Sequence, residues 1–191
     1  MADTTLELFK DTNAYLTGHF RLTSGLHSGE YLQSALVLQH PRLAQKLGEW
    51  LAERMPKGEV VASPALGGLI IGHEVARAMG AKFIFTERDG DGKMTLRRGF
   101  TVSPGERVVV VEDVVTTGGS TREVIDLLRA AGAEVVAAGS IIDRSGGSAD
   151  VGAPRVALTT LKPETWKPEE CPLCRQGRPV EKPGSRKEAG V

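Results

Sequence analysis

Several features that mark other protein classes are missing from this 191-residue sequence. No apolar run approaches the ~20 residues that a membrane-spanning helix needs. The 24 Lys and Arg residues are balanced by 24 Asp and Glu residues, so the chain lacks the basic excess usual in nucleic-acid-binding proteins. Residues 1–5 contain no basic segment leading into an apolar stretch, which argues against a secretory signal. We therefore expect a cytoplasmic protein that binds neither membrane nor nucleic acid.

Cysteine is also scarce, because the chain has only two, Cys171 and Cys174, in the sequence CPLC. A redox CxxC usually opens a helix beside a βαβ unit, whereas this pair lies among prolines. A closed zinc site needs four ligands, and no histidine stands close to this pair in the sequence. We interpret the pair as reduced thiols in a polar tail. The alternatives are a redox or zinc-tethered module and a metal shared between two subunits.

The sequence does contain a regular alternation of apolar strands and amphipathic helices. Short runs rich in Val and Ile, without polar alternation, are typical of strands covered on both faces. Short connections between strands and helices indicate a parallel sheet with helices on both sides, so the expected fold class is α/β. The predicted strands are 60–62, 82–86, 108–111, 135–142 and 156–159, and the predicted helices are 3–16, 41–55, 69–79 and 120–131.

Three segments interrupt this alternation. Residues 18–31 are rich in Gly, Ser and His and are predicted to form a loop. Residues 87–99, ERDGDGKMTLRRG, contain Asp-Gly pairs that favour hairpin turns, so we expect an exposed β-hairpin. The tail from residue 162 holds several prolines and many charges. We expect it to be extended and poorly packed, with roughly the last ten residues disordered.

The segment 108–121, VVVVEDVVTTGGST, carries the clearest chemistry. In an open parallel sheet, ligands bind beyond the carboxyl ends of the strands, and here a strand runs into Glu112 and Asp113. The glycines let the backbone approach a ligand, and free amides at the start of the next helix attract an anion. Carboxylates accept hydrogen bonds from sugar hydroxyls. Together these groups predict a site for a phosphorylated sugar.

Other phosphate-binding loops fit this segment less well. A Walker A loop needs a Lys after its glycines, and this segment has no such Lys. A dinucleotide fingerprint needs the pattern GxGxxG, which the segment also lacks. A purely structural reading, with a buried strand, an Asp turn and a helix capped by Ser120, leaves two adjacent acids and four hydroxyls at one strand end unexplained.

This segment resembles the phosphoribosyl pyrophosphate signature of type I phosphoribosyltransferases. The resemblance implies a central, mostly parallel sheet flanked by helices, with an N-terminal hood and a projecting β-hairpin. It also implies that the two acids hold the ribose hydroxyls, that the loop binds the 5′-phosphate, and that residues 63–68 form the pyrophosphate loop. The residues implied to bind phosphoribosyl pyrophosphate are Glu112, Asp113, Val114, Val115, Thr116, Thr117, Gly118, Gly119 and Ser120.

Two further segments are similar to members of the family that use orotate. Residues 20–32, FRLTSGLHSGEYL, resemble a motif that places an aromatic residue against the base, which is Tyr31 here. Many members carry a Lys at the position of Thr23. Arg144 stands where these members pair an arginine with the substrate carboxylate, which its planar fork matches in two bonds. The residues implied to bind orotate are therefore Tyr31, Thr116 and Arg144.

The predicted hairpin stands where the family has its mobile catalytic loop. Because that loop delivers cations to the pyrophosphate of the neighbouring subunit, the resemblance implies a homodimer with shared active sites. Arg88, Lys93 and Asp113 are the expected catalytic residues. Mg²⁺ is the implied cofactor, held mainly by pyrophosphate and ribose oxygens, so we assign no protein metal ligand.

The resemblance covers residues 9–160, so we divide the chain into a phosphoribosyltransferase domain, residues 1–161, and a partly disordered C-terminal extension, residues 162–191. Within the domain, residues 1–40 form the hood and residues 41–161 the core. The implied reaction transfers the phosphoribosyl group to orotate, giving orotidine monophosphate and pyrophosphate in UMP biosynthesis. A purine phosphoribosyltransferase and a non-catalytic nucleotide-binding regulator are the alternatives. Arg144 discriminates against the former, since a purine lacks the carboxylate.

Overall fold

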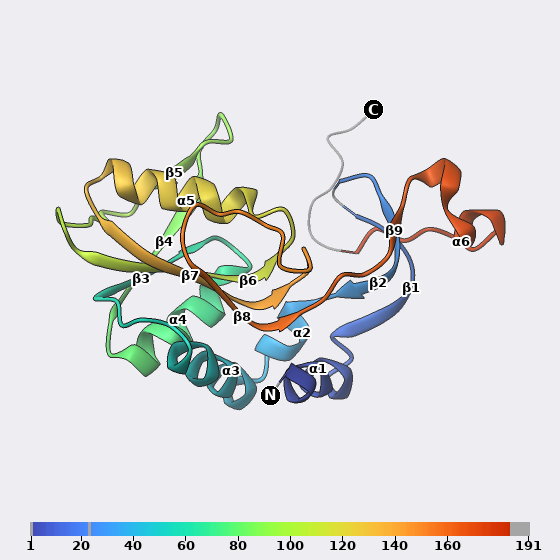
Figure 1. Ribbon diagram of the computed structural model, residues 1–191, viewed down its shortest axis with the longest axis horizontal. Coiled ribbons are helices and arrows are strands. Elements are labelled where there is room, and N and C mark those ends of the chain that lie inside the picture. Colours follow the sequence, from blue (N-terminus) through green and yellow to red (C-terminus); the bar gives the residue numbers. More distant parts are fainter. Residues whose placement is uncertain (1, 23, 184–191) are drawn as a thin grey trace.

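A six-stranded sheet forms the centre of the structure, a computed structural model that describes residues 2–22 and 24–183 (Figure 1). The strands lie in the order β5-β4-β3-β6-β7-β8, all parallel except that β5 is antiparallel to β4. The predicted α/β fold with a mostly parallel sheet is therefore confirmed. The strands are β3 (Val60–Pro64), β4 (Lys82–Arg88), β5 (Met94–Leu96), β6 (Arg107–Val115), β7 (Glu134–Asp143) and β8 (Arg155–Thr160).

The chain reverses its direction across this sheet at the boundary between β3 and β6. From β3 it moves outward to β4 and β5, and it then returns to the other side of β3 to form β6. Loops that leave two such strands diverge and open a crevice, where open α/β sheets bind ligands. Here the diverging loops are residues 65–67 after β3 and residues 116–118 after β6. The topology therefore selects the strand end that the sequence pattern indicated.

Helices cover both faces of the central sheet, with α3 and α4 on one face and α5 on the other (Figure 1). Gly80 follows α4 with a φ of 67°, in the left-handed region that ends helices, so the helix ends at residue 79 as predicted. In the described part of the chain, no helix is long and apolar enough to cross a bilayer. The three helices are α3 (Pro41–Glu53), α4 (Gly68–Met79) and α5 (Gly119–Ala130).

The four consecutive valines of β6 divide between two hydrophobic cores. Val109 and Val111 belong to the core beneath α3 and α4, whereas Val108 and Val110 belong to the core beneath α5. Successive side chains of a strand point to opposite faces, so a continuous apolar run is what a strand covered on both sides requires. The four side chains are fully buried, in agreement with the sequence prediction.

Strand β6 continues beyond the predicted end at residue 111 and includes both acids. Its parallel pairing with β7 runs on to Val115 opposite Asp143. The prediction was wrong about the boundary because polar residues normally mark a strand end, whereas the backbone ladder here persists through them. As a result, rigid strand backbone, and not a loop, positions Glu112 and Asp113.

The hood is a separate three-stranded antiparallel sheet in the order β1-β2-β9, beside the carboxyl ends of the central strands (Figure 1). Segments from both ends of the described chain build it, so the C-terminal extension is part of the hood. Its elements are α1 (Ala2–Asp11), β1 (Tyr15–Arg21), β2 (His27–Leu32), α2 (Ser34–Leu38) and β9 (Thr165–Trp166).

Two expectations about the N-terminal segment are wrong. The helix predicted over 3–16 ends at Asp11, so Leu16 lies on β1, and the predicted loop over 18–31 is the β1–β2 hairpin. Asn13, with a φ of 53°, turns the chain between helix and strand. The pairing shifts by one residue between Thr17 and Phe20, and this bulge breaks the two-residue alternation that reveals a strand.

The prediction of a poorly packed tail is also wrong for much of its length. Strand β9 pairs with β2, and Cys171 is completely buried at the start of α6. The Cys171 Sγ lies 3.5 Å from His19 Nε2, so a histidine distant in sequence is adjacent in space. Residues 184–191, on which the prediction of disorder falls, lie outside the described residues. The two helices of the extension are the 3₁₀ helix η1 (Pro168–Glu170) and α6 (Pro172–Arg175).

Candidate active site

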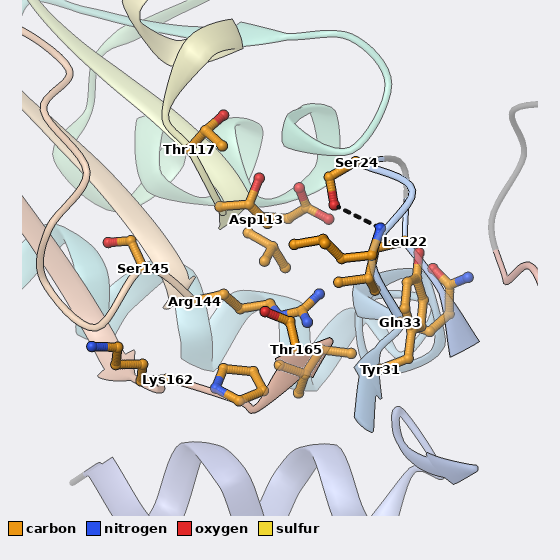
Figure 2. A pocket seen from close by; sticks show the side chains of 15 residues that line it. Leu22, Ser24, Tyr31, Gln33, Asp113, Thr117, Arg144, Ser145, Lys162 and Thr165 are labelled. Carbon is orange, nitrogen blue, oxygen red and sulfur yellow. Dashed lines mark hydrogen bonds between the residues drawn. The ribbon is translucent and has the colours of Figure 1, made fainter. Parts of the chain in front are cut away.

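A cavity of about 530 Å³ lies where the carboxyl ends of β6 and β7 face the hood. Most residues predicted to touch orotate or the ribose line it, although they come from three separate parts of the chain. Figure 2 shows Arg144 extending toward Tyr31, with Asp113 and Thr117 above it. The predicted residues that line the cavity are Tyr31, Asp113, Val114, Thr116, Thr117 and Arg144.

The two adjacent acids point to different sides of the sheet because they are neighbours on a strand. Glu112 continues the α5 side and accepts a hydrogen bond from the Thr121 hydroxyl on that helix. Asp113 continues the α4 side and lines the cavity. The strand end therefore presents one carboxylate on each of its faces, and Asp113 is the only acid lining the described cavity wall.

Asp113 lies directly against the loop that follows β3. A Cβ atom added at Gly67 would lie 2.6 Å from Asp113 Oδ1, closer than real Cβ contacts. The glycine therefore allows the loop backbone to approach this carboxylate. The peptide bond between Ala65 and Leu66 in the same loop is cis. The contact joins the predicted pyrophosphate loop to the predicted ribose-binding acid at the crevice between β3 and β6.

Burial raises the pKa of the Asp113 carboxyl above its usual value. Removing a carboxylate from water disfavours its charged form, and hydrogen bonds from the backbone, chiefly at Val114, oppose that effect only in part. A carboxylate held in this way gains much from hydrogen-bond donors that arrive with a ligand, such as the hydroxyls of a sugar.

The turn between β6 and α5 has the features of an anion-binding loop. Thr116 and Thr117 are exposed, and Gly118 has a φ of 81°, which L side chains rarely adopt. A Cβ at Gly118 would also lie 2.7 Å from a Val151 methyl group. Because α5 begins at Gly119, its first N–H groups have no intrahelical acceptor and point toward this turn.

The two valines assigned to the same ligand have different environments. Val114 lines the cavity, whereas the Val115 side chain is 2% exposed and packs in the core. The Val115 carbonyl accepts a 2.8 Å hydrogen bond from the Arg144 backbone N–H. Val115 therefore fixes the start of the Arg144 segment and can face a ligand only through its backbone.

Arg144 places a partly buried cation in the cavity wall. Its Nε atom is buried and has no hydrogen-bond partner among the residues that the structure describes. Burial lowers the pKa of Arg144, but a guanidinium stays protonated at neutral pH. A buried donor without a partner is costly in free energy, so this group favours an anionic ligand that accepts its hydrogen bonds.

Two tyrosines and a glutamate from the hood surround this guanidinium. Burial raises the pKa of Tyr31, and the positive charge of Arg144 partly opposes that effect. Burial and the neighbouring Glu30 raise the pKa of Tyr15 to about 12, so both phenols are protonated at neutral pH. The Tyr31 ring thus offers the cavity a neutral, flat surface suited to a planar base.

Asp143, the residue before Arg144, has a structural role. It accepts hydrogen bonds from the Ser145 and Gly147 backbone amides at 2.8 and 2.9 Å and forms a 3.0 Å ion pair with Arg155. Although burial opposes the shift, Arg155 and Ser145 hold the pKa of Asp143 below its usual value. These bonds fix the loop that follows Arg144.

The two predicted catalytic cations lie on the hairpin, and neither lines the described cavity wall. Arg88 forms a 2.7 Å ion pair with Glu123 on α5 and donates to the Gly92 carbonyl at 2.6 Å. Lys93 is exposed near the hairpin turn. Figure 1 shows the hairpin rising beside α5, away from the hood. The expectation of an exposed β-hairpin is confirmed by the antiparallel pairing of β4 with β5.

Several polar residues of the cavity wall were missed by the sequence reasoning. Ser145 and Lys162 follow the carboxyl ends of β7 and β8, and the strand-end rule that identified Asp113 would have found them. Gln33 and Thr165 belong to the hood, and no local pattern marks either residue. Thr23, next to the cavity residues Leu22 and Ser24, lies outside the described residues.

Comparisons with known proteins identify relatives along nearly the whole chain. The family described as "Phosphoribosyl transferase domain" matches residues 34–173. An orotate phosphoribosyltransferase of Heliobacterium modesticaldum is 53% identical over 188 residues, covering 96% of this chain and 98% of the relative. The enzyme of the same name from Thermotoga maritima is 52% identical over 182 residues, covering 94% and 97%.

Solved structures show the same fold. The orotate phosphoribosyltransferase of Aeropyrum pernix superposes with a TM-score of 0.69 at 27% identity, covering 82% of this chain and 93% of that one. Leishmania donovani UMP synthase gives 0.70 at 26% identity, covering 83% of this chain and 36% of that one. An adenine phosphoribosyltransferase from Trypanosoma brucei, at 17% identity and a TM-score of 0.59, shares the fold alone. With this fold, this strand-end cavity and these relatives, the chain belongs to the orotate phosphoribosyltransferase family.

Proposed function

We propose that this protein transfers the phosphoribosyl group of phosphoribosyl pyrophosphate to orotate, producing orotidine monophosphate and pyrophosphate. The observation that carries the proposal is the unpartnered, buried Nε of Arg144 in a cavity that also contains the β6–α5 anion loop. A base with a carboxylate would satisfy that guanidinium, whereas a purine would leave it without a partner. The names of the relatives support the same substrate.

Each part of the two substrates has a candidate partner in or beside the cavity. The loop of residues 116–120 would hold the 5′-phosphate through its amides and hydroxyls. Asp113, with Glu112 on the other face of the strand, would accept hydrogen bonds from the ribose hydroxyls. Arg144 and Tyr31 would hold the carboxylate and the plane of the base, with Thr116 between the base and the phosphate loop.

In the proposed reaction, N1 of orotate forms a bond to the anomeric carbon while the bond between that carbon and pyrophosphate breaks. The proton on N1 is lost to a pyrophosphate oxygen or to water. The transition state resembles an oxocarbenium ion beside a departing anion, and the reaction requires no protein nucleophile. Catalysis therefore depends on holding the two reactants in line and on placing positive charge near the leaving group. The hood covers one side of the cavity, which limits access of the water that would hydrolyse the cationic sugar.

The cavity fits a magnesium ion bound mainly through substrate oxygens. Asp113 is the only carboxylate lining the described cavity wall, too few protein ligands for an ion that prefers six oxygens. When bound, Mg²⁺ would neutralise charge on the departing pyrophosphate. The protein would contribute Asp113, indirectly, through the ribose hydroxyls that it orients.

We also propose that the working unit is a cytoplasmic homodimer with shared active sites. Neither Arg88 nor Lys93 lines the described cavity wall of its own chain, so we infer that they reach a pyrophosphate in another subunit. Leu66 and Ile70 are 78% and 45% exposed at the start of α4, next to the loop that contacts Asp113. Large apolar side chains this exposed favour burial against a second copy.

A spectroscopic assay of orotate consumption tests the proposed reaction. With phosphoribosyl pyrophosphate and Mg²⁺, orotate absorbance should fall and pyrophosphate should appear in equal amount. Adenine, hypoxanthine and xanthine should give no product. Turnover of a purine without turnover of orotate would establish the purine alternative instead. Nucleotide binding without turnover of any base would favour a non-catalytic regulator.

A further inference from the structure

Four potential metal ligands converge in the hood, outside the cavity described above. The hood cluster consists of His19 on β1, His27 at the start of β2, and Cys171 and Cys174 around α6. Their ligand atoms all lie within 4.8 Å of one another. Both histidines and Cys171 are buried, whereas Cys174 is exposed. The sequence reasoning missed the cluster because more than 140 residues separate the histidines from the cysteines.

Four of the six separations between ligand atoms match the edges of a tetrahedral zinc site. His19 Nε2 lies 2.9 Å from His27 Nδ1 and 3.5 Å from Cys171 Sγ. Cys174 Sγ lies 3.3 Å from His27 Nδ1 and 3.7 Å from His19 Nε2. Zinc bond lengths in a tetrahedron predict edges of about 3.3 Å between nitrogens and about 3.5 Å between nitrogen and sulfur. Each observed separation lies within about half an ångström of its matching edge.

The surroundings of His19 fix which ring nitrogen is available to a metal. Its Nδ1 lies 2.8 Å from the Arg178 carbonyl oxygen, so Nδ1–H donates to that oxygen and leaves the Nε2 lone pair directed into the cluster. Histidine ligands of metals usually make this second hydrogen bond. The bulge in β1 between Thr17 and Phe20 turns His19 to the buried side together with its neighbour Phe20.

Two other roles account for less of this arrangement. Both cysteines are free thiols, and a disulfide between them would leave two imidazole nitrogens facing each other with no function. A network of neutral hydrogen bonds would satisfy His19 Nε2 with a proton from His27 Nδ1, but it would leave unexplained why both thiols also lie within 3.7 Å of the same nitrogen. Convergence of four lone-pair donors is what a bound cation requires.

We propose that the hood cluster binds one zinc ion through His19, His27, Cys171 and Cys174. Two thiolates and two imidazoles in a tetrahedral arrangement select zinc over Mg²⁺ or Ca²⁺, which prefer oxygen ligands. Because four protein ligands fill the tetrahedron, the site is closed and structural. The zinc ion ties α6 and the C-terminal extension to the β1–β2 hairpin.

This position connects the zinc ion to the shape of the cavity. His27 and Tyr31 lie on the same strand, β2, and Ser28 pairs with Thr165 on β9. Tyr31 and Thr165 both line the cavity. The zinc ion therefore holds together the two hood strands that form one cavity wall. The expected effect on orotate binding rests on the proposed function, whereas zinc binding itself does not.

Metal analysis of the purified full chain tests the proposal directly. Protein produced with added Zn²⁺ and then dialysed should hold about one zinc ion per chain. The double variant C171S/C174S should lose nearly all of it. The control is His73→Asn, which changes an exposed histidine of α4 outside the cluster and should retain the zinc. A folded wild-type chain that holds no zinc after this treatment overturns the proposal.

Cobalt substitution reports the ligands without relying on activity. Wild-type protein stripped of zinc and loaded with Co²⁺ should show thiolate-to-cobalt charge-transfer absorption and the visible bands of a tetrahedral ion. Both should be absent from His19→Asn. Bands typical of six oxygen ligands would contradict the assigned site.

A chelation experiment on the wild-type chain covers the case in which the variants fail to fold. Removing zinc should lower the unfolding temperature, and adding back Zn²⁺, but not Mg²⁺, should restore it, because the ion binds only the folded cluster. The KM for orotate should rise when zinc is removed and should return to its original value when Zn²⁺ is added back. An unfolding temperature that does not respond to chelation or to zinc would refute the site, whatever the outcome of the orotate assay.

Discussion

Under the proposed function, Arg144 is the residue expected to select the base, because its buried Nε has no partner among the described residues. Replacing it with Gln removes the cation while keeping a side chain of similar reach. A charged hydrogen-bonded pair contributes about 1.5–3 kcal/mol, so KM for orotate should rise about 10- to 150-fold. KM for phosphoribosyl pyrophosphate should change little, as steady-state kinetics with each substrate varied in turn would show. Arg42→Gln, an exposed arginine of α3, is the matched control.

Asp113 should show opposite effects on activity and on stability. Burial raises its pKa, so its folded form favours the proton, and its contribution to stability is lost as pH rises through the raised pKa. At neutral pH, Asp113→Asn should therefore increase the unfolding temperature, by about 2–4 °C per kcal/mol at this chain length. The same variant should lose about 100-fold or more in kcat/KM, because the ribose is no longer held in place. A variant that is both less stable and fully active would contradict this role.

The contribution of Asp143 to stability should depend on pH in the opposite way to that of Asp113. Its pKa is depressed in the folded state, so its stabilising contribution is present above the unfolded pKa and is lost as pH falls through the folded one. At pH 7, Asp143→Asn should reduce the free energy of unfolding by about 3 kcal/mol, because it leaves the largely buried Arg155 without its partner. As pH falls below the ordinary aspartate pKa of about 3.9, the difference from wild type should begin to shrink, which urea titrations at several pH values would reveal.

At the level of elements, the β4–β5 hairpin combines a fixed base with an exposed turn. Arg88 is held by Glu123, and Arg98 makes two 2.8 Å hydrogen bonds to Glu87, so both cations are already paired. Arg88 would have to leave Glu123 before it could contact a pyrophosphate. Of the two cations predicted to be catalytic, Arg88 and Lys93, the exposed Lys93 is therefore the better candidate for contact with pyrophosphate.

Substitution of Lys93 by Ala should reduce kcat about 100-fold while changing KM for orotate little, because the lost charge acts on the departing pyrophosphate. Lys57→Ala is the control, since Lys57 is exposed just before β3, at the opposite edge of the sheet from the cavity. Single-turnover measurements would separate the chemical step from product release. Equal effects of the two substitutions would exclude a specific role for the hairpin.

Strand β6 shows why some elements were predictable and others were not. Its valines form a continuous apolar run, and the glycine turn and helix follow at once, so a local pattern identifies strand, loop and helix together. In β1, by contrast, the bulge near Gly18 breaks the alternation, and polar residues occupy buried positions such as His19. The sequence reasoning therefore missed that strand and assigned a loop.

At the scale of the whole molecule, a shared active site makes a prediction about mixed dimers. Lys93→Ala and Asp113→Asn subunits should each be nearly inactive alone. When they are mixed and allowed to exchange, one site of each heterodimer combines an intact cavity with an intact hairpin. The mixture should then recover about a quarter of the wild-type activity. Mixtures that stay inactive, despite heterodimers detected by native mass spectrometry, would show that each subunit works with its own hairpin.

The amino-acid sequence by itself determined the α/β class and the family resemblance, and it predicted a sugar-phosphate loop after β6. Each of these rests on residues that are contiguous in the chain, such as Asp113 and Gly118, whose predicted roles follow from a strand running into a glycine turn. The tertiary structure alone decided that Tyr31, Arg144 and Lys162 face one cavity and that His19 lies against Cys171. Those contacts depend on strand order and on the packing of the hood, which bring Tyr31 and His19 to residues more than 100 positions away and leave no local pattern in the sequence.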